Sequence, residues 1–248
     1  MNMKSAFTLA EVLITLGIIG VVAAMSIPTL IANTSSAKFS SQFKKSFAVL
    51  NQAALMSQSQ YDFDFAGAST ACSTNGADDP KSVASVCALL NGTLAGGSYR
   101  DLSNYNLNQN GIYSTPIIKK EGMIAYQMAD GSMFVFPKGA KSGCALEPGE
   151  SVENNIWNLI DGGCYGYIDV NNVSMPNTEV NCGSDVIIGP YPSSPCVVAK
   201  NAAQMTDIYP VVYHDGTLEA ATNAASYVLS GGGGKGSNLS IPPDQLCK

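Results

Sequence analysis

The residues in this sequence that could perform covalent chemistry occur in settings that argue against an enzyme. The single histidine, His214, is followed by Asp215 and Gly216, a combination typical of a turn. Hydrolases with a serine nucleophile commonly carry it in a Gly-x-Ser-x-Gly turn, and this pattern is missing from the sequence. The sequence therefore predicts a protein without enzymatic activity.

The cysteines suggest disulfide bonds rather than a metal cluster. There is no Cys-x-x-Cys, and His214 is distant in sequence from every cysteine. Pairing sequence neighbours is one of many connectivities, and buried free thiols are the alternative. The neighbour rule predicts the bonds Cys72–Cys87, Cys144–Cys164 and Cys182–Cys196, and leaves Cys247 unpaired.

One loop carries oxygen-bearing side chains at alternate positions, the donor type that calcium prefers. Asp169 and Asn171 begin this loop at residues 169–177, with Glu179 or Asp185 close by. The spacing does not match an EF-hand. A turn held by Asx hydrogen bonds is the alternative, and we favour it. Calcium is thus an optional ligand, and no cofactor is required.

The most unusual residue is Glu11, a carboxylate next to a long apolar run. No charged residue occurs from Val12 to Ala32, which is about the length of a membrane-spanning helix. A charge within such a helix costs about 2.5–3.5 kcal/mol and usually has a partner. A cut before Phe7 would place a new α-amino group four residues from Glu11, and the amine of a staggered neighbour could also reach the carboxylate. We therefore expect an assembly helix that starts in a membrane.

Two simpler interpretations of the apolar run remain open. A secretory signal peptide would be cut after a small residue, for which Ala23 and Ala24 qualify. A plain membrane anchor would need no carboxylate near its first turn.

The segment Lys4–Ile14, with sequence KSAFTLAEVLI, resembles the prepilin cleavage and methylation motif of type IV pilins and type II secretion pseudopilins. Gly17, Gly20 and Pro28 fall where that family places its helix glycines and its helix-kinking proline. The motif covers about a tenth of the chain.

The resemblance implies cleavage between Ala6 and Phe7 by a membrane prepilin peptidase, followed by N-methylation of Phe7. The family usually has glycine before the cut, whereas this chain has Ala6. Glu11 would neutralise the amine of a neighbouring subunit during filament growth. The implied partners are other pilin subunits, an inner-membrane platform protein and an assembly ATPase. The implied location is the bacterial inner membrane, and after assembly an extracellular or periplasmic filament. Several pseudopilins also carry a segment similar to 169–177, in some at a calcium-binding loop.

Composition is consistent with this organisation. The formal net charge is −6 and only 13% of the 248 residues are charged, with no basic cluster typical of nucleic-acid binding. We expect a leader at 1–6, a membrane and assembly helix at 7–60, and a globular domain at 61–248. This domain would include a glycine-rich linker at 230–237 and a C-terminal tail. The linker lacks the glycine order of a phosphate-binding loop.

The sequence predicts one long helix from about Phe7 to Gln58, membrane-spanning first and amphipathic later. An apolar stripe recurs at helical spacing in its second part; its members are Phe39, Phe43, Phe47, Leu50 and Ala54. Residues 33–36 read as a weak interruption. Gly20 and Pro28 disfavour helix interiors, so we expect the portion between them to bend or melt on assembly.

The globular part reads as an antiparallel sheet with long loops. Residues 61–109 are expected to be loop apart from a short helix over about 81–90, introduced by Asp79-Pro80. Strands are expected at 123–128, 133–136, 165–170, 209–213 and 217–220, with Asp-Gly turns closing two hairpins. The fold class is therefore α+β, with the long helix packed on a small sheet as in pilins. A structural filament subunit is the expected function, and a minor pilin acting as a tip adhesin or ligand-binding module is the alternative.

Overall fold

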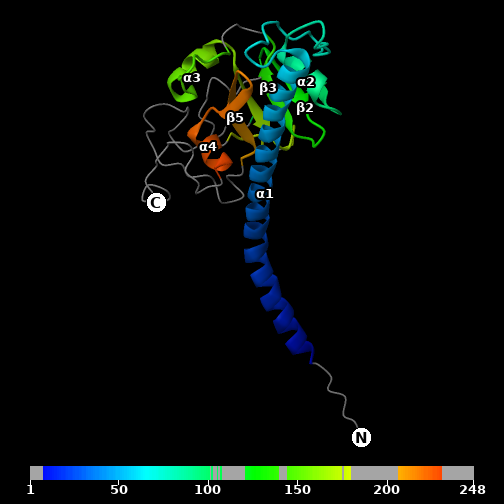
Figure 1. The fold of residues 1–248 in the computed structure, drawn as a ribbon. Helices are drawn as coiled ribbons and strands as arrows, with labels where there is room; N and C mark the ends of the chain where they lie inside the picture. Colours follow the sequence, from blue (N-terminus) through cyan, green and yellow to red (C-terminus); the bar gives the residue numbers. More distant parts are fainter. Residues whose placement is uncertain are drawn as a thin grey trace.

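The computed structural model of the chain describes residues 8–100, 102, 105, 107, 121–139, 144–174, 176–179 and 206–230. One long N-terminal helix packs against an antiparallel sheet of six strands, which confirms the predicted α+β class. The N-terminal half of the helix projects away from the globular part (Figure 1). The glycine-rich segment after Ser230 and the tail with Cys247 lie outside the described residues.

The long helix α1 spans Leu9–Tyr61, 53 residues. Its segment Leu9–Pro28 has a mean hydropathy of 2.2 and is the one helix, among the described residues, long and apolar enough to cross a membrane. None of that segment is buried within the chain. A signal sequence near the N-terminus also has this length and apolar composition, so these two properties alone do not distinguish it from a membrane-spanning helix.

α1 continues through both places where the sequence suggested a break. Pro28 lies inside the helix, where it lacks the N–H that would bond the carbonyl of residue 24. The expected interruption at residues 33–36 is wrong. The Thr34 hydroxyl donates to the Leu30 carbonyl within the helix, so it does not compete with the helical backbone. The N-terminal half of α1 curves gently (Figure 1); whether it melts on assembly stays a prediction.

The second half of α1 is fixed to the sheet by the predicted apolar stripe. Phe39, Phe43, Leu50 and Ala54 are buried, and Phe47 is partly buried against them. The Phe43 ring stacks on Tyr209 of strand β5 with centroids 4.1 Å apart and planes 8° from parallel. This offset ring pair adds geometric specificity to a large burial of apolar area.

Polar contacts add to this packing at the β2–β3 turn. The buried hydroxyls of Ser46 and Ser132 lie 2.8 Å apart. Beside them the Lys45 ammonium is 3.2 Å from the Asp130 carboxylate. Partial burial raises the pKa of Asp130, but the hydrogen bonds with Ser132 and the charge of Lys45 outweigh it, so the net shift is downward. The turn is therefore held against α1 by one buried and one half-exposed contact.

The sheet is a simple meander in which each strand pairs antiparallel with the next in sequence. Its strands are β1 (Ser98–Arg100), β2 (Met123–Gln127), β3 (Met133–Pro137), β4 (Tyr165–Asp169), β5 (Ile208–His214) and β6 (Thr217–Ala220). Five of them were predicted. β1 was missed, because three residues of exposed and half-buried character carry little periodic signal.

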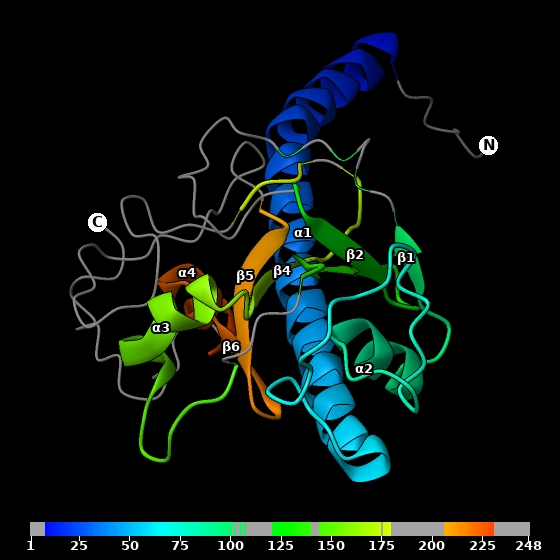
Figure 2. The ribbon, with the colours of Figure 1, turned by 90° about the horizontal axis from the view of Figure 1, so that it is seen from above.

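Three short helices flank the sheet: α2 (Val86–Thr93), α3 (Val152–Asp161) and α4 (Asn223–Leu229). α2 starts five residues later than predicted, because Ser85 is its N-cap and accepts a hydrogen bond from the Ala88 amide at 3.0 Å. The Asp79 carbonyl instead closes a tight turn by accepting from Ser82 and Val83. α3 and α4 were not predicted. Figure 2 shows α2 on one side of α1, and α3 and α4 on the other, near β5 and β6.

We expect that Phe43→Ala lowers the free energy of unfolding by about 3–5 kcal/mol, since it leaves a cavity and removes the stacking on Tyr209. Leu55→Ala is the matched control on the same helix, because the Leu55 side chain is 63% exposed; it should change stability by less than about 1 kcal/mol. Chemical unfolding of the full chain in detergent micelles measures both. Equal losses would mean that the stripe does not anchor α1.

Candidate functional site

The candidate functional site is the N-terminus of α1, where Glu11 has a local role that sequence reasoning missed. Thr8 is the N-cap, and its hydroxyl accepts a hydrogen bond from the Glu11 amide at 3.3 Å. In return the Glu11 carboxylate accepts from the Thr8 amide at 2.8 Å and from its hydroxyl at 2.7 Å. This is a capping box, which satisfies helix N–H groups that lack an intrahelical partner. The Thr-x-x-Glu spacing was visible in the sequence.

The predicted cleavage and methylation residues, Ala6 and Phe7, lie directly before this cap and outside the described residues. Glu11 is therefore placed at the third helical position, three residues after Thr8. A carboxylate there is favoured by the positive end of the helix dipole.

The helix after the cap presents an apolar surface that the chain itself does not cover. Its large side chains between Leu9 and Leu30 are exposed, from 44% for Val12 to 78% for Leu9. A groove of about 430 Å³ lies along this surface; its lining residues are Ile14, Gly17, Ile18, Val21 and Val22.

The helix glycines have no packing role within the chain. A Cβ atom placed on Gly17 or Gly20 would meet no atom within 4 Å, so alanine would fit at both positions. Each glycine nevertheless costs about 1 kcal/mol relative to alanine in a helix. Their use at these positions therefore finds no explanation in the fold of the single chain.

The loop predicted to bind calcium is held by hydrogen bonds. Asp169 is fully buried at the end of β4, and its carboxylate accepts from the Asn171 amide at 3.1 Å and from the Tyr105 hydroxyl at 2.5 Å. The first bond spans two residues, as in an Asx turn. Glu179 is buried and forms a parallel bridge with Ile208. Asp185 lies outside the described residues.

Sequence reasoning missed the principal partner of this loop, Asp207. Its buried carboxylate accepts from the Asn177 amide at 2.9 Å and from the Thr178 amide at 2.7 Å. Asn177 is in the left-handed region, with a φ of 47°, which asparagine tolerates better than most residues. Asp207 lies 38 residues from Asp169 in the sequence, so no local pattern could have connected them.

The two buried aspartates carry raised pKa values. Burial raises the pKa of Asp169 to about 8; the hydrogen bond from Tyr105 opposes the shift, and the charge of Asp207 adds to it. Burial also raises the pKa of Asp207 to about 6, against the hydrogen bonds from Thr178 and Asn177. Tyr105, Tyr167 and Tyr209 are titratable groups near this pair, and burial raises their pKa values as well.

Among the described residues of this loop, no three carboxylate oxygens from different residues lie within 4.8 Å of one another. Across the described part of the chain, one group brings three histidine, cysteine or carboxylate ligand atoms within 4.8 Å of one another, and it consists of Cys72, Asp78 and Cys87. Calcium at Asp169, Asn171 and Glu179 therefore stays a prediction.

Four of the cysteines form two disulfide bonds, Cys72–Cys87 and Cys144–Cys164. These are two of the pairs that the neighbour rule gives. Cys182 and Cys196 lie outside the described residues. The second bond joins the segment before α3 to the start of β4, where the Cys164 carbonyl accepts from the Tyr213 amide at 3.0 Å.

Both ring nitrogens of His214 lie close to carboxylates. Its Nδ1 is 2.9 Å from the Asp215 carboxylate and its Nε2 is 3.3 Å from the Glu219 carboxylate. Burial lowers the pKa of His214, but the hydrogen bonds with Glu219 and Asp215 outweigh it and the net shift is upward. Since both ring nitrogens face carboxylates, the ring is not arranged to activate a serine.

The buried aspartates predict that the chain loses stability as the pH rises. An unfolded aspartate has a pKa of about 3.9, so the folded state holds protons that the unfolded chain has released. This contribution is complete below about pH 4 and is lost as the pH rises through the folded pKa, at up to about 1.4 kcal/mol per pH unit and carboxyl. Asp207→Asn should flatten the dependence between about pH 4 and 6, and Asp169→Asn between about pH 4 and 8. Urea unfolding at each pH measures this, with exposed Asp79→Asn as the control.

Calcium would compete with protons for the same oxygens, which tests the metal prediction separately. If the ion binds, millimolar CaCl₂ at pH 8 raises the melting temperature of the wild-type chain and leaves that of Asp169→Asn unchanged. An equal response of both chains, or none, would speak for the Asx-turn interpretation.

Comparison with known protein families identifies the N-terminal segment of the chain. Residues 1–27 match the family described as the prokaryotic N-terminal methylation motif. No curated protein and no solved structure matches the chain. The matched segment contains Thr8, Glu11 and the first turns of α1, and it joins the apolar helix that fits a membrane-anchored precursor. The chain thus begins with the prepilin-type methylation motif shared by type IV pilins and type II secretion pseudopilins.

Proposed function

We propose that the chain is a structural subunit of a type IV pilus or of a type II secretion pseudopilus, assembled through α1. The observation that carries the proposal is a methylation motif at residues 1–27 on a helix whose first half is apolar and uncovered. Prepilin peptidase would cut between Ala6 and Phe7, and Phe7 would then be N-methylated. The assembly ATPase and the platform protein are the partners that such a filament requires.

Cleavage would create a positively charged amine at the start of α1, which is unfavourable in a single chain because the N-terminal end of the helix dipole is also positive. The new amine at Phe7 would lie one residue before the N-cap Thr8, at the positive end of the helix dipole. The nearest carboxylate in sequence is Glu11. In a membrane or a filament core this charge pair is stronger than in water, and a neighbouring copy offers the same pair. Side-by-side packing of identical helices thus brings two amines and two carboxylates together.

The apolar surface and the glycines of α1 support the same arrangement. Bundling would bury the exposed side chains between Leu9 and Leu30, at about 25 cal/mol per Å² once the helix leaves the bilayer. Small residues such as Gly17 and Gly20 let helix backbones approach closely. A neighbouring helix therefore accounts for glycines that the single chain does not need.

A minor pilin with a binding role at the filament tip is the second candidate. The globular part has a groove of about 640 Å³, whose lining includes Tyr99, Arg100, Glu121 and Lys138. Charged and aromatic groups in one groove are typical of recognition surfaces. Abundance distinguishes the two roles, because a major subunit dominates sheared filaments and a tip protein is scarce.

Substitutions at Glu11 and Thr8 separate assembly from helix capping. Glu11→Gln removes the charge but keeps a capping box, since glutamine serves at this position. We expect it to reduce the filaments sheared from cells by about tenfold or more, as loss of one partner from a desolvated charge pair costs about 2–5 kcal/mol. Thr8→Val removes the cap at about 1 kcal/mol and leaves the charge, so filament yield should stay within about threefold of wild type. Similar losses in both variants would assign Glu11 to capping alone.

Mass spectrometry of the protein from cells tests the processing step. We expect a chain that starts at Phe7 with one added methyl group on its amine. A chain that keeps Met1, or one that starts near Ser26, would contradict the proposal and favour a plain anchor or a signal peptide.

A further inference from the structure

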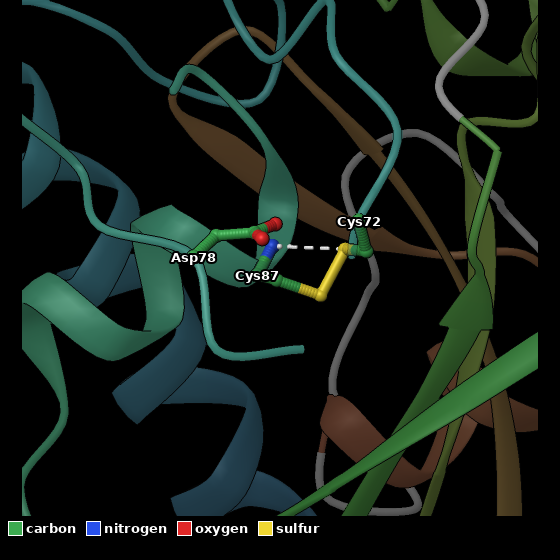
Figure 3. Close-up of side chains that lie close together, drawn as sticks. All are labelled: Cys72, Asp78 and Cys87. Atoms are coloured by element: carbon green, nitrogen blue, oxygen red, sulfur yellow. Dashed lines mark hydrogen bonds between the residues drawn. A yellow bond between two sulfur atoms is a disulfide. The ribbon is translucent and has the colours of Figure 1, made fainter. Parts of the chain in front are cut away.

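The loop before α2 brings two cysteine sulfurs and a carboxylate together (Figure 3). The Sγ atoms of Cys72 and Cys87 and a carboxylate oxygen of Asp78 all lie within 4.8 Å of one another. In this structure the two sulfurs are joined as a disulfide. Thiolate and carboxylate donors at this separation are those of a small divalent-metal site once the sulfurs are separate.

The carboxylate is held in place by the loop itself. Both Asp78 oxygens accept from the Ser73 amide at 3.2 Å, and one also accepts from the Ser85 hydroxyl at 2.6 Å. Ser85 in turn caps α2 through the Ala88 amide. These bonds do not involve the cysteine sulfurs, so breaking the disulfide does not itself remove them.

The sulfurs also have defined surroundings. The Cys87 side chain is buried in the second position of α2, and its amide donates to the Cys72 sulfur at 3.2 Å. An N–H group at a helix N-terminus stabilises a neighbouring thiolate. Cys72 is only partly buried, which leaves a side from which an ion and a water molecule can enter.

We propose that the reduced chain binds one zinc ion through the thiolates of Cys72 and Cys87 and the carboxylate of Asp78. Zinc takes sulfur and oxygen ligands in tetrahedral geometry, and a water molecule from the exposed side of Cys72 would complete the four. Calcium and magnesium prefer oxygen alone, and copper(I) prefers sulfur alone, so a mixed set of two sulfurs and one oxygen selects zinc.

The distances allow this exchange of a disulfide for a metal. Two thiolates on one tetrahedral zinc lie about 3.8 Å apart, given Zn–S bonds of about 2.3 Å. Rotation of the two side chains can provide this, because the Cα atoms are 5.6 Å apart. Binding displaces the two thiol protons. Thiol–disulfide exchange with a disulfide-carrying oxidoreductase then breaks the carrier's S–S bond and both Zn–S bonds and forms the Cys72–Cys87 bond. The carrier accepts the two electrons, takes up two protons to become a dithiol, and the zinc ion is released.

The metal-bound state would belong to the chain before it is oxidised. A newly made chain carries thiols, and disulfides form only in an oxidising compartment. Zinc on Cys72 and Cys87 would hold the two partners side by side and keep them from pairing with the other five cysteines. The proposal does not depend on filament assembly, so it can fail without affecting the proposed function.

The test is a zinc titration of the full chain in detergent, reduced with a phosphine and kept free of oxygen. A chromophoric chelator that competes for zinc reports affinity and stoichiometry. Compared with reduced wild type, the double variant Cys72→Ser/Cys87→Ser should lose one bound zinc per chain, whereas Cys144→Ser/Cys164→Ser should keep that zinc. The oxidised wild-type chain should bind none at this site. Retention of the zinc by Cys72→Ser/Cys87→Ser, or no binding by the reduced wild type, overturns the proposal.

A matched pair of variants tests the third ligand. Asp78→Asn should weaken zinc binding by about tenfold or more. Asp79→Asn makes the same change one residue away, on a carboxylate that accepts from the Lys81 amide instead, and should leave the affinity unchanged. Reduced Cys72 and Cys87 also give cobalt(II) a sulfur charge-transfer band, which must persist in Asp78→Asn if the variant is folded. Equal zinc affinities of Asp78→Asn and Asp79→Asn overturn the assignment of Asp78.

Discussion

The structure depends on one helix that meets two different solvents. Phe43 and its neighbours on the stripe bury the second half of α1 against the sheet, and the ring stacking with Tyr209 fixes how the helix lies. The first half has the same backbone and no cover from its own chain. The hydrophobic effect therefore completes the globular part but leaves an apolar rod that needs cover from outside the chain. That imbalance fits a membrane-anchored precursor, and the proposed assembly would use the same surface.

Two buried carboxyl groups at one end of the sheet lower the stability of the globular part at neutral pH. Asp169 and Asp207 are buried within a few residues of the paired ends of β4 and β5, where burial raises the pKa of both. Their oxygens organise a long loop by accepting from the amides of Asn171, Asn177 and Thr178. A buried carboxylate is costly unless its oxygens are hydrogen-bonded, and here they accept from backbone amides of the loop. The loop is thus ordered at the expense of stability at neutral pH.

Much of the fold was predictable from sequence, and the misses have physical causes. The long periodic stripe and the Asp-Gly hairpins are strong local signals, and the elements they predicted are present. α3 carried a comparable signal: Val152, Ile156 and Leu159 follow Ser151 at helical spacing and are buried. Both Asp79 and Ser85 are of a type that caps helices, and in the structure α2 is capped by Ser85. A start after Ser85 places Cys87 in the first turn, where its side chain is buried.

The sequence was enough to identify the residues of the candidate site, but most of their contacts with distant residues could not be predicted from it. Glu11 is recognisable from sequence because a carboxylate beside an apolar run needs a reason. Its bond with Thr8 was readable from spacing, whereas the convergence of Asp78 with two cysteines required the folded loop. The link between Asp169 and Asp207 likewise depends on β4 and β5 being neighbours in the sheet. Local patterns identify such residues; only the tertiary structure pairs them.

The continuity of α1 through Pro28 sets the orientation of the whole subunit. A helix of 53 residues is a rod of about 80 Å that advances about 1.5 Å and turns about 100° with each residue. While the helix stays continuous, Glu11 and Phe43 lie at a fixed axial distance and a fixed angle about the same axis. Removing or inserting a single residue between them would swing the globular part by more than a quarter turn relative to the end that is embedded. Length in this segment thus matters as much as side-chain chemistry, because it sets the rotation of the globular part about the axis relative to the N-terminal end of α1.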